Sequence, residues 1–367
     1  MGDSGKRIRR EPDVAEQLLA TIGLNCPAPH LLTDRVLLGH GSGGKMSAAL
    51  LREHFLPHLS NPALEALGDA AVVAVEGSQI AMSTDTFVVS PLEFPGGNIG
   101  SLAVHGTLND VAMMGARPLY LSAGFVLEEG LELEVLDRIV RALGAAAAAA
   151  GVPLVTGDTK VVERGKADGM FINTTGVGLL HAGFRPAPNR AEPGDVVVVS
   201  GPLGRHGMAI MAAREGIAFE SRIESDSATL IPLVDRMRQS VGADVHVLRD
   251  PTRGGLASAL NEIASASAVG IVLDEAAIQV PVEVAAACEM LGLDPLYVAN
   301  EGVLTAIVPA AAREAALASL RSHPLGEAAA CVGRVVREHP GLVVLRTTLG
   351  GTRIVDLLPG DQLPRIC

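Results

Sequence analysis

The chain has 367 residues, 48% hydrophobic and 19% charged, which indicates a globular protein with two domains rather than a disordered chain. Its formal net charge of −12 argues against nucleic acid as a partner, because phosphate recognition needs basic patches. Carboxylates become useful to an acidic protein that binds polyphosphate when a divalent metal is present, since they then serve as ligands.

Cysteine usage and hydropathy bear on the compartment. Cys26, Cys288, Cys331 and Cys367 lie far apart in the sequence, so neither a zinc site nor a disulfide framework is predicted and a cytoplasmic location is expected. No apolar stretch has the length of a membrane-spanning helix, so no membrane partner is expected. Residues 1–35 lack the apolar run of a signal peptide and are predicted to be a weakly ordered extension.

The first motif is a glycine-rich loop over residues 39–46, with the sequence GHGSGGKM. It nearly fits the Walker A pattern, but Met46 stands where a Ser or Thr would hold Mg²⁺, so a Walker site is disfavoured. Small residues still let backbone N–H groups converge on an anion, and Lys45 adds a point charge. A phosphate-contacting loop is therefore predicted; the structural alternative is a plain glycine-rich linker.

Acidic residues recur at the ends of the next elements. A strand pair is predicted over 69–87 with a turn at 76–78, which would bring Asp69 and Asp85 together. Two close carboxylates repel unless a metal or proton lies between them, whereas a single pair of this kind is usually turn punctuation. A helix is predicted from the N-cap Asn98 to Met113–Met114, and Asp110 has few charged neighbours in it, so Asp110 is a functional candidate.

The remaining elements follow in order. A strand over 119–126, a helix over 131–150 and a strand over 152–156 lead into Gly157-Asp158-Thr159-Lys160, where an acid and a base follow a strand. A strand over 171–180 and a proline-marked linker precede a second half that opens at Asp195 with a similar coarse plan.

The second half contains two further candidate sites. In RDPTRGG at 249–255, Thr252 can cap the following helix, and the open N–H groups favour an anion. Glu301 is either a turn residue or a base at a strand edge. His105 and His206 are expected to be packed or solvated rather than metal ligands.

The chain closes with a glycine- and proline-containing segment from Arg346 that is predicted to be loose. Its last residue is Cys367, whose thiol on a mobile end could travel to a site and react there. The structural alternative is that a chance residue ends the sequence.

Five aspartates in small-residue contexts, together with the Lys45 loop, form a set suited to Mg²⁺-ATP: Asp69, Asp85, Asp110, Asp158 and Asp250. The set resembles the PurM-like ATP-binding superfamily, and from about Arg35 to Cys367 the chain is similar to its HypE family of hydrogenase maturation proteins. The resemblance rests on HGSGGK at 40–45, STDTFVVSPLEFPGGNIG at 83–100, LAVHGTLNDVAMMGARP at 102–118, GDTKVV at 157–162, RDPTRGG at 249–255 and PRIC at 364–367.

That resemblance implies a fold of two α/β domains, 36–188 and 189–345, with a flexible tail over 346–367. The first domain is expected to dimerise and to bind ATP near the dimer interface. The implied activity starts with a carbamoyltransferase, HypF, which places a carbamoyl group on Cys367. ATP then phosphorylates the carbamoyl oxygen, and loss of phosphate leaves a thiocyanate whose cyano group passes to iron on a HypC–HypD complex for [NiFe]-hydrogenase.

The resemblance also implies roles for individual residues. Cys367 carries the carbamoyl group, and either Lys160 or Glu301 is the base, Lys160 otherwise stabilising negative charge. The expected metal ligands are Asp69, Asp85, Asp110 and Asp250. The expected ATP-binding residues are Gly43, Gly44, Lys45, Thr84, Asp85, Asn109, Asp158 and Thr159.

Two other functions stay open. A small-molecule kinase or synthetase of the same superfamily would be fully active without Cys367, although a selenophosphate synthetase would want a reactive cysteine in 39–47, where there is none. A non-enzymatic scaffold would bind nucleotide without hydrolysing it.

Overall fold

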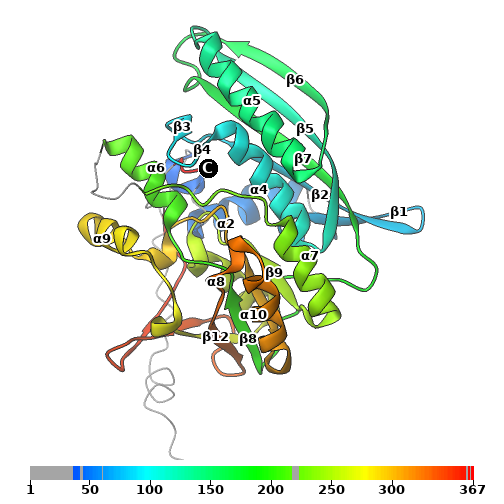
Figure 1. Ribbon diagram of the computed structural model, residues 1–367, viewed down its shortest axis with the longest axis vertical. Helices are drawn as coiled ribbons and strands as arrows, with labels where there is room; N and C mark the ends of the chain where they lie inside the picture. Colours follow the sequence, from blue (N-terminus) through cyan, green and yellow to red (C-terminus); the bar gives the residue numbers. More distant parts are fainter. Residues whose placement is uncertain (1–35, 42–43, 60, 217–222, 361–362, 364) are drawn as a thin grey trace, which may run out of the picture. The chain divides into compact units, whose positions relative to one another are not determined.

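The computed structural model describes residues 36–41, 44–59, 61–216, 223–360, 363 and 365–367 (Figure 1). The predictions for the extension 1–35 and for Gly43 therefore lie outside the described residues. The described residues form a mixed α/β structure with two large sheets and a two-stranded one, and the large sheets decide where each candidate residue points.

Among the described residues, the first sheet has five strands in the order β1-β2-β7-β5-β6. Neighbouring strands are antiparallel except for β5 and β6, which are parallel. The predicted hairpin over 69–87 is confirmed, with Ala71 opposite Met82. The strands are β1 Ala71–Val75, β2 Ser78–Phe87, β5 Ala116–Glu128, β6 Leu154–Val162 and β7 Met170–Leu180.

Two helices pack on one face of this sheet. Helix α4 (Ile99–Met113) starts as predicted at Asn98, whose side chain accepts the N–H groups of Gly100 and Ser101 in a capping box. It is buried nearly all round because it packs on β2 and β7, on α5 and on α7. Helix α5 (Leu133–Ala150) buries Ile139, Leu143 and Ala146 at helical spacing and ends at Gly151, with φ +68°.

The two faces of the first sheet have different surroundings. Along β2, Ser83 and Asp85 face α4, because the Ser83 hydroxyl contacts Asp110 and the Thr107 hydroxyl contacts Asp85. Thr84, between them, is exposed and accepts a hydrogen bond from the Thr175 hydroxyl on β7. Successive side chains of a strand point to opposite faces. Asp85 and Thr84 therefore lie on the inner and outer faces of the sheet.

The described second sheet has seven strands in the order β14-β13-β10-β12-β8-β11-β9. Both of its faces are covered: on β8, Val197 and Val199 pack with α8, whereas Val198 packs with α7 and α10. The strands are β8 Asp195–Val199, β9 Val247–Arg249, β10 Gly270–Asp274, β11 Thr305–Pro309, β12 Ala330–Val336, β13 Val343–Arg346 and β14 Thr352–Ile354. The helices are α7 Ile231–Ser240, α8 Gly255–Ser267 and α10 Arg313–Arg321.

The start of α8 corrects one expectation. Thr252 does not cap the helix; the N-cap is Gly254, and no side chain caps it. Gly254 has φ +73° and Gly255 has φ +61°, a region that disfavours side chains. A Cβ on Gly255 would lie 2.5 Å from the Leu296 carbonyl oxygen, so the backbone packs too closely for another residue.

The shorter elements lie around the glycine-rich loop and the chain end. They are η1 Leu38–Gly41, α2 Lys45–Leu50, α3 Leu56–Leu59, β3 Glu93–Phe94, β4 Gly97–Asn98, α6 Arg205–Glu215 and α9 Val282–Leu291. Figure 1 shows the end of the chain beside β3, β4 and α6. In the described part of the chain, no helix is both long and apolar enough to cross a membrane.

The last segment differs from the loose tail that was expected. Strand β14 pairs with β13, and Val355 is fully buried in the core of the second sheet. Further on, Leu363 and Ile366 are buried in the core cluster that includes α4 and α6. The glycine and proline content of this segment led to the prediction that it is unpaired. Composition does not show that the segment pairs with β13, because that pairing depends on the tertiary structure. The structure shows the described tail residues in a docked conformation.

Candidate functional site

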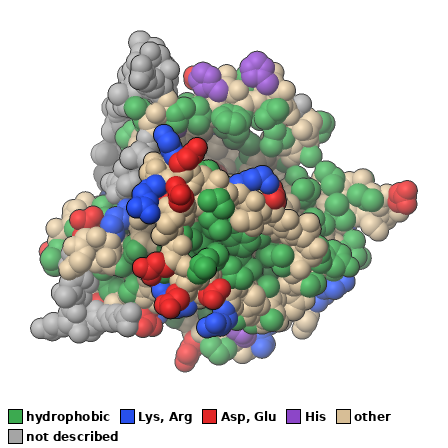
Figure 2. Space-filling view, turned by 90° about the horizontal axis from the view of Figure 1, so that it is seen from above, with side chains coloured by type: hydrophobic (Ala, Val, Ile, Leu, Met, Phe, Trp, Pro, Cys, Tyr) green, Lys and Arg blue, Asp and Glu red, His purple; other side chains and the backbone are tan. Residues whose placement is uncertain are grey.

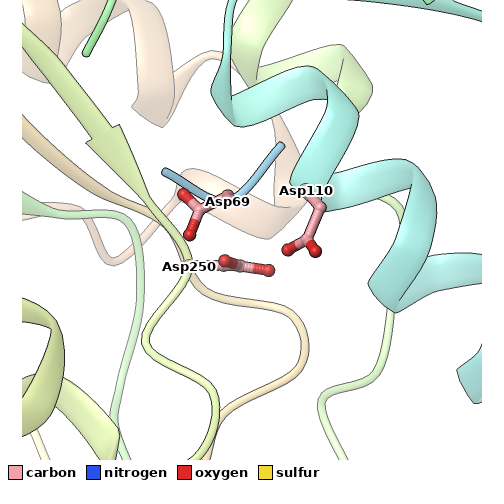
Figure 3. A group of neighbouring side chains, drawn as sticks. All are labelled: Asp69, Asp110 and Asp250. Carbon is pink, nitrogen blue, oxygen red and sulfur yellow. The ribbon is translucent and has the colours of Figure 1, made fainter. Parts of the chain in front are cut away.

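Three of the predicted metal ligands meet at one point. Ligand atoms of Asp69, Asp110 and Asp250 all lie within 4.8 Å of one another. Figure 3 shows the three carboxylates facing a common centre from three elements: the segment before β1, helix α4 and the segment after β9. The first domain and the second half of the chain thus both contribute to the cluster.

Each carboxylate is positioned by neighbours. Asp69 Oδ1 accepts from Arg249 Nη1 at 2.7 Å, and both side chains are largely buried. Asp110 Oδ2 accepts the Ser83 hydroxyl at 2.8 Å. Arg249 also pairs with Glu262, so a cation beside the cluster compensates part of its charge. Sequence reasoning missed Arg249, although it precedes Asp250 in the RDPTRGG motif.

The donor set fits a hard divalent cation. Asp250 Oδ2 is buried without a hydrogen-bond partner among the described residues, an unfavourable state unless a ligand is bound. Burial raises the pKa of Asp69 and of Asp110 well above the ordinary range, and neighbouring carboxylates raise both further. Burial raises the pKa of Asp250 to about 6. Bound Mg²⁺ would offset the repulsion between these carboxylates and give Asp250 Oδ2 a partner.

Asp85 and Glu301 lie near these three aspartates, and the five carboxyl groups are called the acidic cluster below. Asp85 Oδ2 lies 2.8 Å from the Thr107 hydroxyl, and burial raises the pKa of Asp85. Glu301 is 3% exposed; burial raises its pKa well above the ordinary range, and the charges of Asp250 and Asp226 raise it further. A buried carboxyl with such a shift beside a metal-type cluster is suited to acid–base chemistry.

Arg253 and Asp226 are two residues near Glu301 that sequence reasoning missed. Arg253 is an exposed cation near Asp85, Glu301 and Cys367, and the charge of Cys367 is the largest cause that raises its pKa. The signal was available in RDPTRGG, which was interpreted through its glycines rather than this arginine. Asp226 accepts the N–H groups of Glu301 and Gly302, each at 3.2 Å. Its segment carries no sequence motif that points to this contact.

The tail brings Cys367 into the same region. Cys367 lines a cavity with Gly44 of the glycine-rich loop and with Arg253 and Gly254 at the start of α8. Its main-chain oxygen accepts the Val88 N–H at 3.0 Å, and the Arg365 oxygen accepts the Ser90 N–H at 3.2 Å. The tail therefore runs along the segment after β2, and the thiol-bearing residue lies beside the predicted anion-binding loop.

The other predicted base lies elsewhere in the chain. Lys160 is on β6, where its Nζ contacts Asp158 Oδ2 at 2.6 Å, and both side chains are 70% exposed. Lys160 and hydrogen bonding from Thr159 N–H lower the pKa of Asp158. Like Thr84, Asp158 and Lys160 belong to the exposed face of the first sheet, whereas Thr159, between them on the edge strand β6, points to the other face. Within one chain, the structure does not bring Thr84, Asp158, Thr159 or Lys160 together with the acidic cluster.

Two further predicted ATP-binding residues have partners in the protein. Lys45 forms an ion pair with Asp356, and its N–H donates to the Leu358 oxygen. Asn109 is buried: its Nδ2 donates to the Ala228 oxygen at 3.0 Å and its Oδ1 accepts the Leu230 N–H at 2.7 Å. Asn109 thus attaches α4 to the segment before α7, and its role in ATP binding stays a prediction.

Neutralising Asp110 is expected to stabilise the metal-free protein. Asp110→Asn keeps an acceptor for the Ser83 hydroxyl but removes one of three crowded charges, so the free energy of unfolding rises by about 1 kcal/mol, or roughly 2–4 °C in Tm. Added Mg²⁺ raises the Tm of the wild type and not that of the variant, because ligand binding stabilises the folded state. Thermal unfolding with EDTA and with Mg²⁺ measures both. A lower Tm of the variant in EDTA would contradict the like-charge account.

The raised pKa of Asp250 predicts a pH-dependent difference between the metal-free wild type and Asp250→Asn. Folded Asp250 has a pKa of about 6, above its ordinary value of 3.8. Its proton stabilises the folded state fully below pH ~3.8 and is lost as pH rises through about 6. From pH 5 to pH 7 the wild type should lose roughly 1 kcal/mol relative to the variant. Denaturant unfolding at both pH values measures this; a constant difference would remove Asp250 from the buried cluster.

Comparisons with known proteins agree with these two halves. Residues 67–180 match the model of the N-terminal domain of AIR synthase related proteins, and residues 192–345 match that of the C-terminal domain. Carbamoyl dehydratase HypE of Cupriavidus necator is 54% identical over 349 residues, which cover 95% of this chain and 99% of that protein.

Two solved structures are similar along nearly the same length. HypE in complex with ATP is 51% identical, with a TM-score of 0.77, and the match covers 91% of this chain and 100% of that one. A chain of a HypE–HypF complex is 45% identical, with a TM-score of 0.81, and the match covers 84% and 100%. With both domain models matched and identity above half along almost the whole chain, this protein belongs to the HypE family of carbamoyl dehydratases.

Proposed function

We propose that this protein is an ATP-dependent dehydratase that converts a carbamoyl group on its own Cys367 to a thiocyanate, which supplies the cyanide ligand for the iron of [NiFe]-hydrogenase. The observation that carries the proposal is the docked tail. Cys367 lines one cavity with Gly44 and Arg253, and Arg253 is in turn close to Asp85 and Glu301. A thiol carried on this segment thus lies beside both a candidate phosphate-binding loop and a candidate base.

The reaction balances without a redox partner. The carbamoyl oxygen of Cys–S–C(O)NH₂ attacks the γ-phosphorus of ATP, which forms a C–O–P bond and releases ADP. Both amide protons then leave as the C–O bond breaks, so the products are Cys–S–C≡N and inorganic phosphate, which keeps the carbamoyl oxygen. Phosphorylation is needed because an amide oxygen is a poor leaving group, and phosphate is a good one.

Glu301 is the base that we propose for the amide protons. It is buried beside Asp250 and Asp226, which raises its pKa toward the range useful for proton transfer, and Arg253 limits that rise. Lys160 lies on the exposed side of the first sheet in a pair with Asp158. Within one chain, the placement of the two residues favours Glu301.

Asp69, Asp110 and Asp250, with Asp85 beside them, would hold Mg²⁺. Bound there, Mg²⁺ would neutralise charge on the triphosphate and on the departing phosphate. Arg253, a cation near the terminal residue, would stabilise negative charge on the phosphorylated oxygen. ATP binding is supported by the 51% identical HypE that was solved with ATP. We assign Gly43, Gly44 and Lys45 to phosphate contacts.

A homodimer through the first sheet accounts for the residues on its exposed side. On the face that carries Thr84, apolar side chains stand exposed on three neighbouring strands: Met82 on β2, Leu179 on β7, and Tyr120 and Val126 on β5. Figure 2, seen from the end where α5 and β6 lie, shows hydrophobic side chains gathered with charged ones around them. Exposed apolar patches of this kind mark interaction surfaces. A second copy packed there would place Thr84, Asp158 and Lys160 at the interface, near which ATP is expected, with Thr159 next to them on the edge strand.

The proposed partners follow from the chemistry of the tail. HypF, which was solved in complex with a 45% identical HypE, would carbamoylate Cys367. A HypC–HypD complex would accept the cyano group. Both steps need Cys367 accessible, so the docked tail must leave its cavity between reactions. A cytoplasmic location stays a prediction.

Single-turnover stoichiometry tests this function. Protein carbamoylated with HypF and carbamoyl phosphate, then freed of HypF, is expected to release one inorganic phosphate for each carbamoyl group lost when ATP and Mg²⁺ are added. Unmodified protein is the control and should release little phosphate in the same time. Steady ATP hydrolysis with the carbamoyl group intact would contradict the proposal and favour a kinase or synthetase with another acceptor.

A further inference from the structure

A buried histidine holds the peptide group next to the reactive cysteine. His206, in the first turn of α6, places its Nε2 2.6 Å from the main-chain oxygen of Ile366. His206 is fully buried and Ile366 is 4% exposed, so water does not compete for this contact. The oxygen belongs to the peptide bond that joins Ile366 to Cys367. Any rotation of that peptide would move the thiol.

The contacts of His206 fix which nitrogen carries the proton. A carbonyl oxygen only accepts, so Nε2 must be the donor. Nδ1 lies 2.8 Å from the Ser225 hydroxyl oxygen, which also accepts the Ser227 N–H at 3.1 Å. Because a neutral imidazole carries a proton on one nitrogen only, Nδ1 accepts and the Ser225 hydroxyl donates. Burial lowers the pKa of His206 to about 4, so the ring is neutral near pH 7. The Phe94 ring packs edge-on against the imidazole with centroids 5.6 Å apart, which restrains its orientation.

Other contacts hold the tail at the residues on either side of Ile366. The Arg365 oxygen accepts from Ser90 N–H and from Arg214 Nη2 at 2.7 Å, and the Cys367 oxygen accepts from Val88 N–H. The Ile366 oxygen, between them, accepts from His206 Nε2 instead. His206 is therefore a contact that holds the peptide before Cys367 through its oxygen.

The same segment also positions the proposed base. Ser225 is followed by Asp226, whose carboxylate oxygens accept the N–H groups of Glu301 and Gly302. Gly302 has no room for a side chain, since a Cβ there would lie 1.8 Å from the Asp226 oxygen. Two adjacent residues, Ser225 and Asp226, thus link the histidine that holds the tail and the backbone that carries Glu301.

We propose that His206, kept by Ser225 in the tautomer with a proton on Nε2, is a positioning residue that seats Cys367 for dehydration, and that Ser225–Asp226 keeps this seat in register with Glu301. The part concerning dehydration rests on the proposed function. The seat itself is a property of the tail and can be measured without HypF or ATP. Misplacement of a reacting group by about 1 Å can cost ~100-fold in rate.

The first experiment measures the seat alone. Alkylation of the wild type and of His206→Gln and His206→Asn with iodoacetamide is followed by peptide mapping of Cys367. The Gln amide can place a donor where Nε2 lies, whereas the shorter Asn amide cannot. Cys367 is expected to react at least several-fold faster in the Asn variant than in the Gln variant or wild type. His105→Asn is the matched control, because His105 is also largely buried and bonds Ser227, not the tail.

The second experiment measures dehydration by carbamoylated protein at saturating ATP. The first-order rate constant should fall ~10- to 100-fold in His206→Asn and much less in His206→Gln, while the half-saturating ATP concentration and carbamoylation by HypF stay unchanged. Equal alkylation and equal rates in the Gln and Asn variants would overturn the seating role. If Cys367 is alkylated faster in His206→Asn but the wild type shows no dehydration, the seating role stands and the proposed function is rejected. The Gln–Asn comparison decides even if His206→Ala fails to fold.

Discussion

Cys367→Ala is expected to abolish thiocyanate formation while leaving ATP binding unchanged. The thiol is the proposed carrier, so its removal leaves no atom to carbamoylate. The tail should still dock, because its anchors lie elsewhere: Arg365 pairs with Asp168 at 2.8 Å and donates to the Val88 oxygen, and Ile366 stays buried. The substitution changes neither the acidic cluster nor the loop that contains Lys45. Titration of ATP-Mg²⁺ by calorimetry and mass spectrometry after incubation with HypF measure the two effects.

Cys331→Ala is the control for that experiment. Cys331 lies on β12 in the second sheet and contacts the Gly333 oxygen of its own strand. This variant should form thiocyanate at the wild-type rate. Loss of ATP affinity in Cys367→Ala would mean that the thiol supports the nucleotide site structurally, which contradicts a carrier role.

The second large effect is expected at Glu301. Glu301→Gln preserves size and burial but removes the carboxylate, and loss of a general base lowers rates by about 10²–10⁴-fold. Because burial and neighbouring acids raise the pKa of Glu301, the wild-type rate should rise with pH as this group ionises. The variant should lose that rise, while carbamoylation by HypF is unaffected. Single-turnover dehydration across pH 6 to ~9 measures it.

Lys160→Met separates the two candidate bases. If Glu301 is the base, the dehydration rate of Lys160→Met still rises with pH. The substitution can change ATP affinity, because Lys160 lies at the proposed dimer interface, without removing that rise. A variant of Lys160 that loses the rise, together with a Glu301→Gln enzyme that keeps it, would assign the base to Lys160 of a neighbouring chain.

Local signals predicted much of the fold from the sequence. The hairpin over 69–87 and the helix capped by Asn98 depend on residues close in sequence, and both are confirmed. The convergence of Asp69, Asp110 and Asp250 comes from three distant segments, and the family resemblance grouped them where periodicity could not. Strand alternation alone would have separated Thr84 from Asp85, yet the sequence interpretation placed both at one ATP site.

The docked tail and its contacts could not be predicted. Arg253, Asp226 and His206 act through contacts with residues far away in the sequence, and such contacts leave no local pattern. Glycine and proline near residues 350–360 were interpreted as signs of a loose segment, but such residues do not show whether the following segment docks. Ile366, an apolar residue next to Cys367, was the available hint, because an exposed mobile end does not need it.

The most direct test of the central claim is the mass of the peptide that carries Cys367, measured after incubation with HypF and carbamoyl phosphate and again after addition of ATP-Mg²⁺. The account predicts a carbamoyl adduct on Cys367 that loses the mass of one water only with hydrolysable ATP, and that persists in Glu301→Gln. A Cys367 peptide that stays unmodified while ATP is consumed would contradict it.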